Sequence, residues 1–83
     1  MIKYSVILPI YNEETVIQNC LASLAKQTVA KDTEIIVVDD GSTDKSESFA
    51  TLHQDHLGPG AARNLGAKKA KGDILVFVDA DME

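Results

Sequence analysis

The chain is poor in the residues that mark secreted, disulfide-stabilised or membrane-spanning proteins. It has no tryptophan, two prolines and a single cysteine, Cys20, which cannot form an internal disulfide and indicates a reducing compartment. The longest apolar run, residues 74–78, is far shorter than the roughly 20 residues of a membrane helix. No apolar signal segment precedes Pro9, so the sequence predicts a cytoplasmic location, with a peripheral position at the inner face of the membrane left open.

Basic residues are also scarce. Eight lysines and arginines stand against 13 aspartates and glutamates, which gives a net charge of −5 and a pI of about 4.8. This balance argues against nucleic acid or an anionic membrane surface as the main partner. A functional site is therefore expected among the acidic residues.

The length of 83 residues fits one small domain, residues 1–83, because typical domains have roughly 100–150 residues. Hydrophobic residues make up 45% of the chain and charged residues 25%, which is the composition of a globular protein. A domain of this size buries only about 60% of the surface of its unfolded chain, so the core is expected to be thin and the chain to be a piece of something larger.

Three short apolar runs, at residues 4–10, 34–38 and 73–78, are rich in valine, isoleucine and leucine. Their length and continuous apolar character predict strands that are buried on both faces. Helical patterns separate them. A stripe of apolar residues at helical spacing follows Asn12, which is a candidate N-cap, and Glu13 and Glu14 fall in the expected first turn.

Two further helices are expected. One begins at Ser42 or Thr43 and turns Phe49, Ala50 and Leu52 inward. The other spans residues 61–70, after a glycine-proline-glycine loop, and stops at a glycine. The polar link at residues 53–56 gives no support for a strand.

This order of elements predicts an α/β fold, in which right-handed crossovers build a parallel sheet with helices on both faces. We expect the strand at residues 4–10 to lie between those at residues 34–39 and 73–79. In such Rossmann-like sheets, ligands bind outside the carboxyl ends of the strands.

Carboxylates gather at these expected strand ends. They are Glu13, Asp39, Asp40, Asp79 and Asp81. Such a cluster is costly unless a cation or ligand donors offset the repulsion. Because residues i and i+2 of an extended chain point the same way, Asp79 and Asp81 could present two carboxylates to one hard cation.

Each feature also has a purely structural interpretation. Residues 40–43 read as a turn followed by an N-cap, and residues 79–81 as a strand terminus. Arg63, one turn into its helix, could hold an anion. His53 and His56 have the spacing of half a metal site, but no third histidine or nearby cysteine accompanies them, which argues against a metal role.

Four segments together are far more specific than any one of them. In order and spacing they resemble the N-terminal, nucleotide-sugar-binding half of family 2 glycosyltransferases with the GT-A fold. The segments are SVILPIYNEE at residues 5–14, EIIVVDDGSTD at 34–44, GPGAARNLG at 58–66 and DILVFVDAD at 73–81.

The resemblance implies a role for the nucleoside-binding residues. Pro9, Tyr11 and Glu13 would line the base pocket. Asp40 would hydrogen-bond the pyrimidine ring or the ribose, with Asp39 supporting it.

The resemblance also implies how the diphosphate is held. Arg63 matches the basic residue near the base and diphosphate, and residues 79–81 match the Asp-any-Asp motif. In that motif, Asp79 would contact the ribose or the metal, and Asp81 would coordinate Mg²⁺ or Mn²⁺.

The implied activity is transfer of a sugar from a nucleoside diphosphate, with UDP favoured, to an unidentified glycan, lipid or protein acceptor, with inversion. The catalytic base and the acceptor-binding half are expected beyond Glu83, so the chain reads as a donor-binding half, truncated or completed by another chain. Two alternatives stay open: a non-catalytic nucleotide-binding or assembly module, and a Mg²⁺-dependent receiver-like domain. A P-loop nucleotidase is disfavoured because the phosphate-binding motif is missing.

Overall fold

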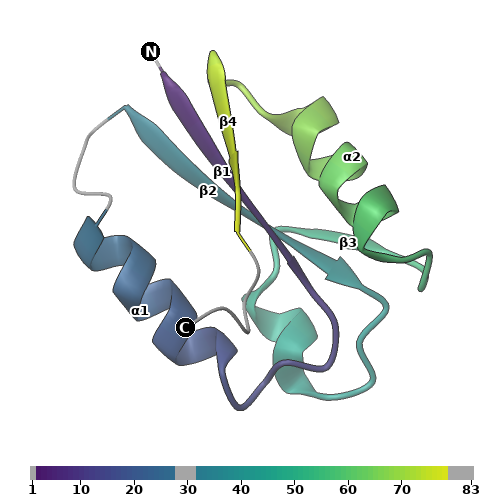
Figure 1. Cartoon of the computed structure of the whole chain (residues 1–83). Coiled ribbons are helices and arrows are strands. Elements are labelled where there is room, and N and C mark those ends of the chain that lie inside the picture. Colours follow the sequence, from purple (N-terminus) through teal and green to yellow (C-terminus); the bar gives the residue numbers. More distant parts are fainter. Residues whose placement is uncertain (1, 28–31, 79–83) are drawn as a thin grey trace.

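The computed structural model describes residues 2–27 and 32–78, which form a four-stranded parallel sheet with one α-helix on each face (Figure 1). The strand order is β3-β2-β1-β4. This arrangement confirms the predicted α/β class and the central place of the first strand. The elements are β1 (Tyr4–Ile10), α1 (Ile17–Gln27), β2 (Thr33–Asp40), the 3-10 helix η1 (Lys45–Phe49), β3 (Leu52–Gln54), α2 (Pro59–Lys69) and β4 (Ile74–Phe77).

The two central strands, β1 and β2, are buried on both faces because α1 covers one face of the sheet and α2 covers the other. Val37 of β2 packs with Ile17 of α1, whereas its neighbours Ile36 and Val38 pack with Ala62 of α2. This alternation follows from the two-residue period of a strand. The core therefore consists of two thin layers of side chains, one on each face of strands β1 and β2.

The predicted burial on both faces is wrong for strand β4. It pairs with β1 through its whole length, but each of its four apolar side chains is between 39% and 49% exposed. Within the described part of the chain it is an edge strand with little cover on either face. No helix among the described residues is long and apolar enough to cross a bilayer.

The prediction of an N-cap at Asn12 is wrong. Helix α1 begins at Ile17, and the carbonyl of Glu13 accepts hydrogen bonds from the backbone N–H groups of Val16 and Ile17 in the preceding turn. Asn12 itself adopts a left-handed conformation, with φ of 51°, and its side chain accepts from the backbone N–H of Thr43 at 2.8 Å. Its polar side chain therefore stabilises a contact between two loops and caps no helix.

The prediction of a helix that begins at Ser42 or Thr43 is also wrong. Only the short η1 forms, and the chain then enters β3, whose Leu52 lies opposite Val38 of β2. The polar segment at residues 53–56, predicted to be irregular, thus supplies part of an edge strand. Pairing with the exposed backbone edge of β2 overrides the local helical pattern, and a polar edge strand tolerates solvent on its open side.

Helix α2 begins two residues earlier than predicted, at Pro59, because proline is tolerated in a first turn. It ends before Ala70, and Lys68 and Lys69 lie in its last turn, where the helix dipole favours basic residues. Gly66 lies where this helix crosses β1. A Cβ atom there would lie 2.5 Å from Cγ2 of the buried Ile7 and 3.3 Å from Cγ2 of Val38.

The close approach at Gly66 predicts a stability effect. Gly66→Ala should lower the free energy of unfolding by about 1–3 kcal/mol, because the added methyl overpacks a β-branched side chain with little rotamer freedom. Gly60→Ala is the matched control in the same helix, since no atom beyond its chain neighbours and the backbone of its own helix lies within 4 Å of its Cβ position. Urea unfolding measures both, and equal stability of the two variants would contradict the packing argument.

Candidate functional site

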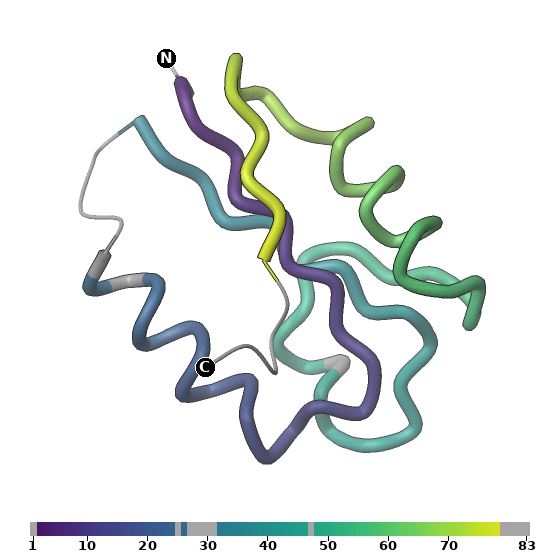
Figure 2. Tube along the Cα trace, in the orientation of Figure 1, coloured from purple at the N-terminus to yellow at the C-terminus, as the bar shows by residue number. Residues whose placement is uncertain are grey.

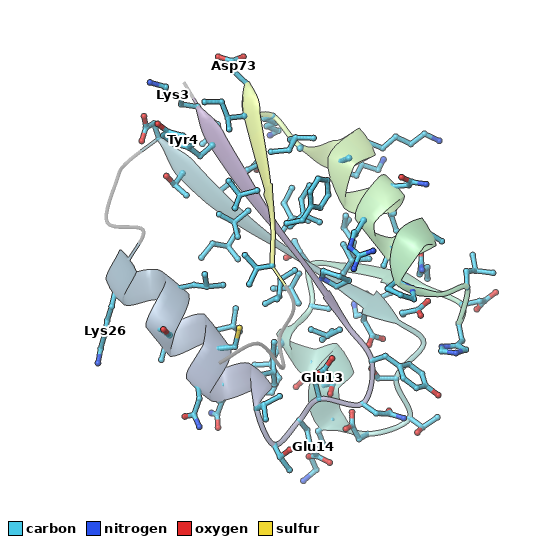
Figure 3. The ribbon with its side chains drawn as sticks, viewed as in Figure 1. Lys3, Tyr4, Glu13, Glu14, Lys26 and Asp73 are labelled. Atoms are coloured by element: carbon cyan, nitrogen blue, oxygen red, sulfur yellow. The ribbon has the colours of Figure 1, made fainter. Side chains whose placement is uncertain are left out.

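The carboxyl ends of β1, β2 and β3 meet at one edge of the sheet, because all three strands run parallel. Figure 3 shows Glu13 and Glu14 at this edge, while Lys3, Tyr4 and Asp73 lie at the opposite edge. The loops that follow these strands therefore form a common surface where a ligand can bind.

The loops after β1 and β2 run side by side and are joined by hydrogen bonds (Figure 2). The backbone N–H of Asn12 donates to Oγ of Ser42 at 2.9 Å. The backbone N–H of Glu13 donates to Oγ of Ser46 at 2.6 Å, and Ser46 is completely buried. These bonds fix the start of the loop that carries Tyr11 and Glu13.

Asp40, the last residue of β2, is 3% exposed. Its carboxylate accepts from Nε2 of Gln54 at 2.7 Å and from the backbone N–H groups of Leu57 at 2.8 Å and Gly58 at 3.0 Å. Burial alone would raise the pKa of this carboxyl group, but the three donors outweigh it and hold the pKa below its ordinary value. Asp40 is therefore charged at neutral pH.

Asp39 faces a different hollow from its neighbour, as alternation along a strand requires. Both of its carboxylate oxygens accept from the backbone N–H of Ser42 at 3.3 Å, and Oδ2 lies 3.7 Å from Nδ1 of His53. The hollow is wide and open, with a volume of about 810 Å³. It is lined by Asp39, Gly41, Ser42, Ser48, His53, Gln54 and Asp55.

A smaller and more enclosed pocket of about 270 Å³ lies on the Asp40 side. Its lining residues are Pro9, Ile10, Tyr11, Glu13, Asp40, His56 and Pro59. The structure thus brings together four of the residues that the sequence singled out, at Pro9, Tyr11, Glu13 and Asp40. The sequence did not single out Ile10 or Pro59, and it considered His56 only as a metal ligand.

Gly41 explains how His56 reaches this pocket. Its φ is 77°, and a Cβ atom there would lie 2.8 Å from the backbone nitrogen of His56. Only glycine tolerates both the left-handed conformation and this approach of the loop. The glycine after the two aspartates was therefore a signal for a close backbone contact.

The other predicted site residues do not line the Asp40 pocket. Arg63 lies on α2 and is not among the residues that line either hollow. Asp79 and Asp81 lie outside the described residues. Within residues 2–27 and 32–78, no three histidine, cysteine, aspartate or glutamate side chains form a group that could hold a metal ion. The backbone N–H of Val78 donates to the carbonyl of Ile7 at 3.0 Å, so β4 brings the chain toward the same edge as β1.

A parallel sheet with a pocket outside the carboxyl ends of its strands is the arrangement of Rossmann-like ligand-binding proteins. Residues 5–83 match the sequence model of the family described as Glycosyl transferase family 2, and the chain belongs to that family. The resemblance drawn from the four sequence motifs is thereby confirmed.

Relatives of known name agree with this assignment. The chain is 42% identical over 93 residues to a poly(ribitol-phosphate) beta-glucosyltransferase of Bacillus spizizenii, covering 95% of this chain and 15% of that protein. It is 40% identical over 94 residues to the poly(ribitol-phosphate) beta-N-acetylglucosaminyltransferase TarS of Staphylococcus aureus, covering 98% of this chain and 16% of TarS. The chain therefore spans about a sixth of the length of these two curated relatives.

Solved structures show the same fold. A crystal structure of residues 1–349 of S. aureus TarS superposes with a TM-score of 0.87 at 39% identity, covering 96% of this chain and 28% of that one. A second structure of the same TarS fragment, in complex with UDP, has a TM-score of 0.81 at 41% identity with the same coverage. The predicted GT-A type of α/β fold is confirmed by these matches.

The lowered pKa of Asp40 predicts how stability depends on pH. A carboxyl group whose pKa is lower in the folded than in the unfolded chain stabilises the fold above its ordinary pKa of 3.8 and loses that contribution as the pH falls through the lowered value. Urea unfolding from about pH 6 to about pH 2 should show this loss. Asp40→Asn should be less stable than the unsubstituted chain near pH 6 and should have a flatter acid profile.

Asp73→Asn is the control for this pH series, because Asp73 is exposed at the opposite edge of the sheet (Figure 3). Its acid profile should follow that of the unsubstituted chain. If the acid profile of Asp40→Asn also followed that of the unsubstituted chain, the hydrogen bonds to Asp40 would not stabilise its charged form.

Proposed function

We propose that this chain forms the donor-binding part of a glycosyltransferase and binds a nucleoside-diphosphate sugar, with UDP as the favoured nucleotide. The observation that carries the proposal is the pocket in which the buried carboxylate of Asp40 and the ring of Tyr11 line one small cavity. The UDP complex of TarS, a protein 41% identical to this chain, supports this choice of nucleotide.

The proposed binding mode uses the chemistry of each pocket residue. Tyr11 is 41% exposed and offers an aromatic face to a nucleobase. Asp40 accepts a hydrogen bond from a ring N–H or a ribose hydroxyl, while Pro9 and Glu13 form the adjoining wall. Asp39 holds the turn at Ser42 and thereby supports Asp40.

The diphosphate requires positive charge. We assign Arg63 as the side chain near the base and diphosphate, and Asp79 and Asp81 as the holders of Mg²⁺ or Mn²⁺, with Asp79 also within the nucleotide-binding set. Two carboxylates suit a hard divalent cation, and β4 delivers the chain to the edge where the pocket lies. When bound, the cation would neutralise the charge that develops on the departing diphosphate.

The proposed reaction is a single displacement with inversion at the anomeric carbon. The bond from that carbon to the diphosphate oxygen breaks as a bond to the acceptor hydroxyl oxygen forms, and a carboxylate base takes the hydroxyl proton. No residue of the chain is assigned as this base. The acceptor is left as a glycan, lipid or protein.

The second candidate function is a nucleotide-binding module without catalysis, because the described pocket could hold a ligand and includes no residue assigned as a base. A receiver-like domain has lost its support, since the chain belongs to Glycosyl transferase family 2. Calorimetric titration separates the classes: the proposal expects binding of UDP with Mn²⁺ and no comparable binding of acetyl phosphate. Sugar transfer by the complete protein then separates an enzyme from a binding module.

Asp40 gives the sharpest test of the pocket. Asp40→Ala should weaken UDP binding by about 1–3 kcal/mol, the usual cost of removing one partner of a buried hydrogen bond. Isothermal titration calorimetry with UDP and Mn²⁺ measures the effect. Unchanged affinity would show that Asp40 does not contact the ligand.

Because Asp40 also accepts bonds from Leu57 and Gly58, the variant needs a folding control. Thermal unfolding of Asp40→Ala should still be cooperative at the temperature of titration. Asp73→Asn removes a carboxylate from the opposite edge of the sheet and should leave UDP affinity unchanged.

The metal proposal predicts cooperative binding. Two protein carboxylates leave a six-coordinate cation short of ligands, so diphosphate oxygens and water must complete its shell. UDP should therefore bind more tightly with Mn²⁺ than without it, and Asp81→Asn should abolish most of this difference. If Mn²⁺ strengthened UDP binding to Asp81→Asn as much as to the unsubstituted chain, Asp81 would not hold the metal. The 83-residue chain is expected to transfer sugar slowly or not at all.

A further inference from the structure

His56 lies directly beside the two pocket residues that carry the proposed function. Its ring centroid is 4.1 Å from that of Tyr11, with the two planes tilted by 40°. Its Nδ1 atom lies 3.1 Å from the backbone carbonyl oxygen of Asp40 and 3.3 Å from Oδ2 of the same residue. One side chain therefore contacts both the aromatic face and the buried acid.

The hydrogen-bond partners determine which imidazole nitrogen carries a proton. Both atoms near Nδ1 are oxygens that can only accept, so Nδ1 must be the donor. Oδ1 of Asp40 already accepts from Gln54 and Leu57, whereas Oδ2 has the backbone N–H of Gly58 and the imidazole beside it. His56 thus lies beside Oδ2, the carboxylate oxygen that Gln54 and Leu57 do not contact.

The backbone of His56 is also held in place. The next two residues donate their N–H groups to Asp40, and Gly41 permits the approach of the His56 nitrogen. The pocket of about 270 Å³ is present with the imidazole in this position, and His56 lines it. The side chain is therefore a wall of the cavity and leaves room for a ligand.

We propose, on the basis of the donor-binding function above, that His56 is a positioning residue for the nucleobase. Its ring sets the tilt of Tyr11, and its Nδ1–H directs Oδ2 of Asp40 toward the ligand. Uracil carries an N–H between two carbonyl groups, whereas cytosine carries a lone pair at that ring nitrogen. A correctly directed carboxylate accepts from the first and repels the second, so His56 contributes to the choice between uracil and cytosine nucleotides.

Titration calorimetry with UDP and with CDP, each with the same Mn²⁺ concentration, tests this role. His56→Ala should weaken UDP binding by about three- to tenfold, as expected for loss of one aromatic contact, and should lower the UDP-to-CDP affinity ratio. His56→Asn retains a side-chain N–H donor and should restore much of the ratio. His56→Phe retains the ring and should restore UDP affinity more than the ratio.

His53→Ala is the matched control, because it removes the other histidine of the chain, which lines the wide hollow beside Asp39. It should leave both affinities unchanged. If His56→Ala kept the UDP affinity and ratio, the positioning role would be wrong. Equal weakening of UDP and CDP, together with a lower melting temperature, would show a structural role only and would also overturn the proposal. Failure of the unsubstituted chain to bind UDP would instead overturn the donor-binding function on which this role rests.

Discussion

The carboxylate of Asp40 is the contact on which the rest of the pocket depends. It ends β2 inside the protein and accepts from the side chain of Gln54 and from the backbone N–H groups of Leu57 and Gly58. These donors come from β3 and from the loop that enters α2. One buried charge therefore fixes the end of an edge strand, a loop and the start of a helix, and its desolvation is offset by the donors it organises.

A second set of bonds places the opposite wall. Asn12 and Glu13 are held by Ser42 and Thr43 of the loop after β2 and by Ser46 of η1. Because the left-handed conformation of Asn12 turns the chain at this point, Tyr11 remains at the carboxyl edge next to the Asp40 pocket. Both walls are thus attached to the same strand end, so the geometry of the pocket depends on β2 more than on either helix.

The sequence predicted the parts of the structure that depend on apolar pattern. Continuous apolar runs predicted the three main strands, and the alternation of strands and helices predicted their parallel order. The errors fall where long-range polar contacts compete with local propensity. Asn12 has the residue type of an N-cap but bonds Thr43 instead, and residues 52–54 pair with β2 although their pattern suggested a helix and a link.

The same distinction applies to the pocket. Pro9, Tyr11, Glu13 and Asp40 were predictable because each follows or ends an apolar run, and strand ends meet at one edge of a parallel sheet. His56 was not predictable as a pocket residue, since its place depends on the left-handed glycine at position 41 and on backbone bonds to Asp40. Its short distance in sequence from His53 gave the two histidines the spacing of half a metal site, whereas the structure places them beside different aspartates.

The residues proposed to bind the nucleoside and those proposed to hold the metal belong to different parts of the sheet. The nucleoside-side contacts proposed here come from β1, β2 and the loop before α2, which are buried or mutually hydrogen-bonded. The residues proposed to hold the metal follow β4 in the sequence. This edge strand pairs only with β1 within the described sheet, and its apolar side chains are between 39% and 49% exposed. An edge strand with so little cover is held mainly by its backbone pairing, so the position of β4 is less constrained than the positions of β1 and β2. In the proposed function, the base would bind in a pre-formed pocket, whereas the residues proposed to hold the metal follow a strand that is paired along one side alone.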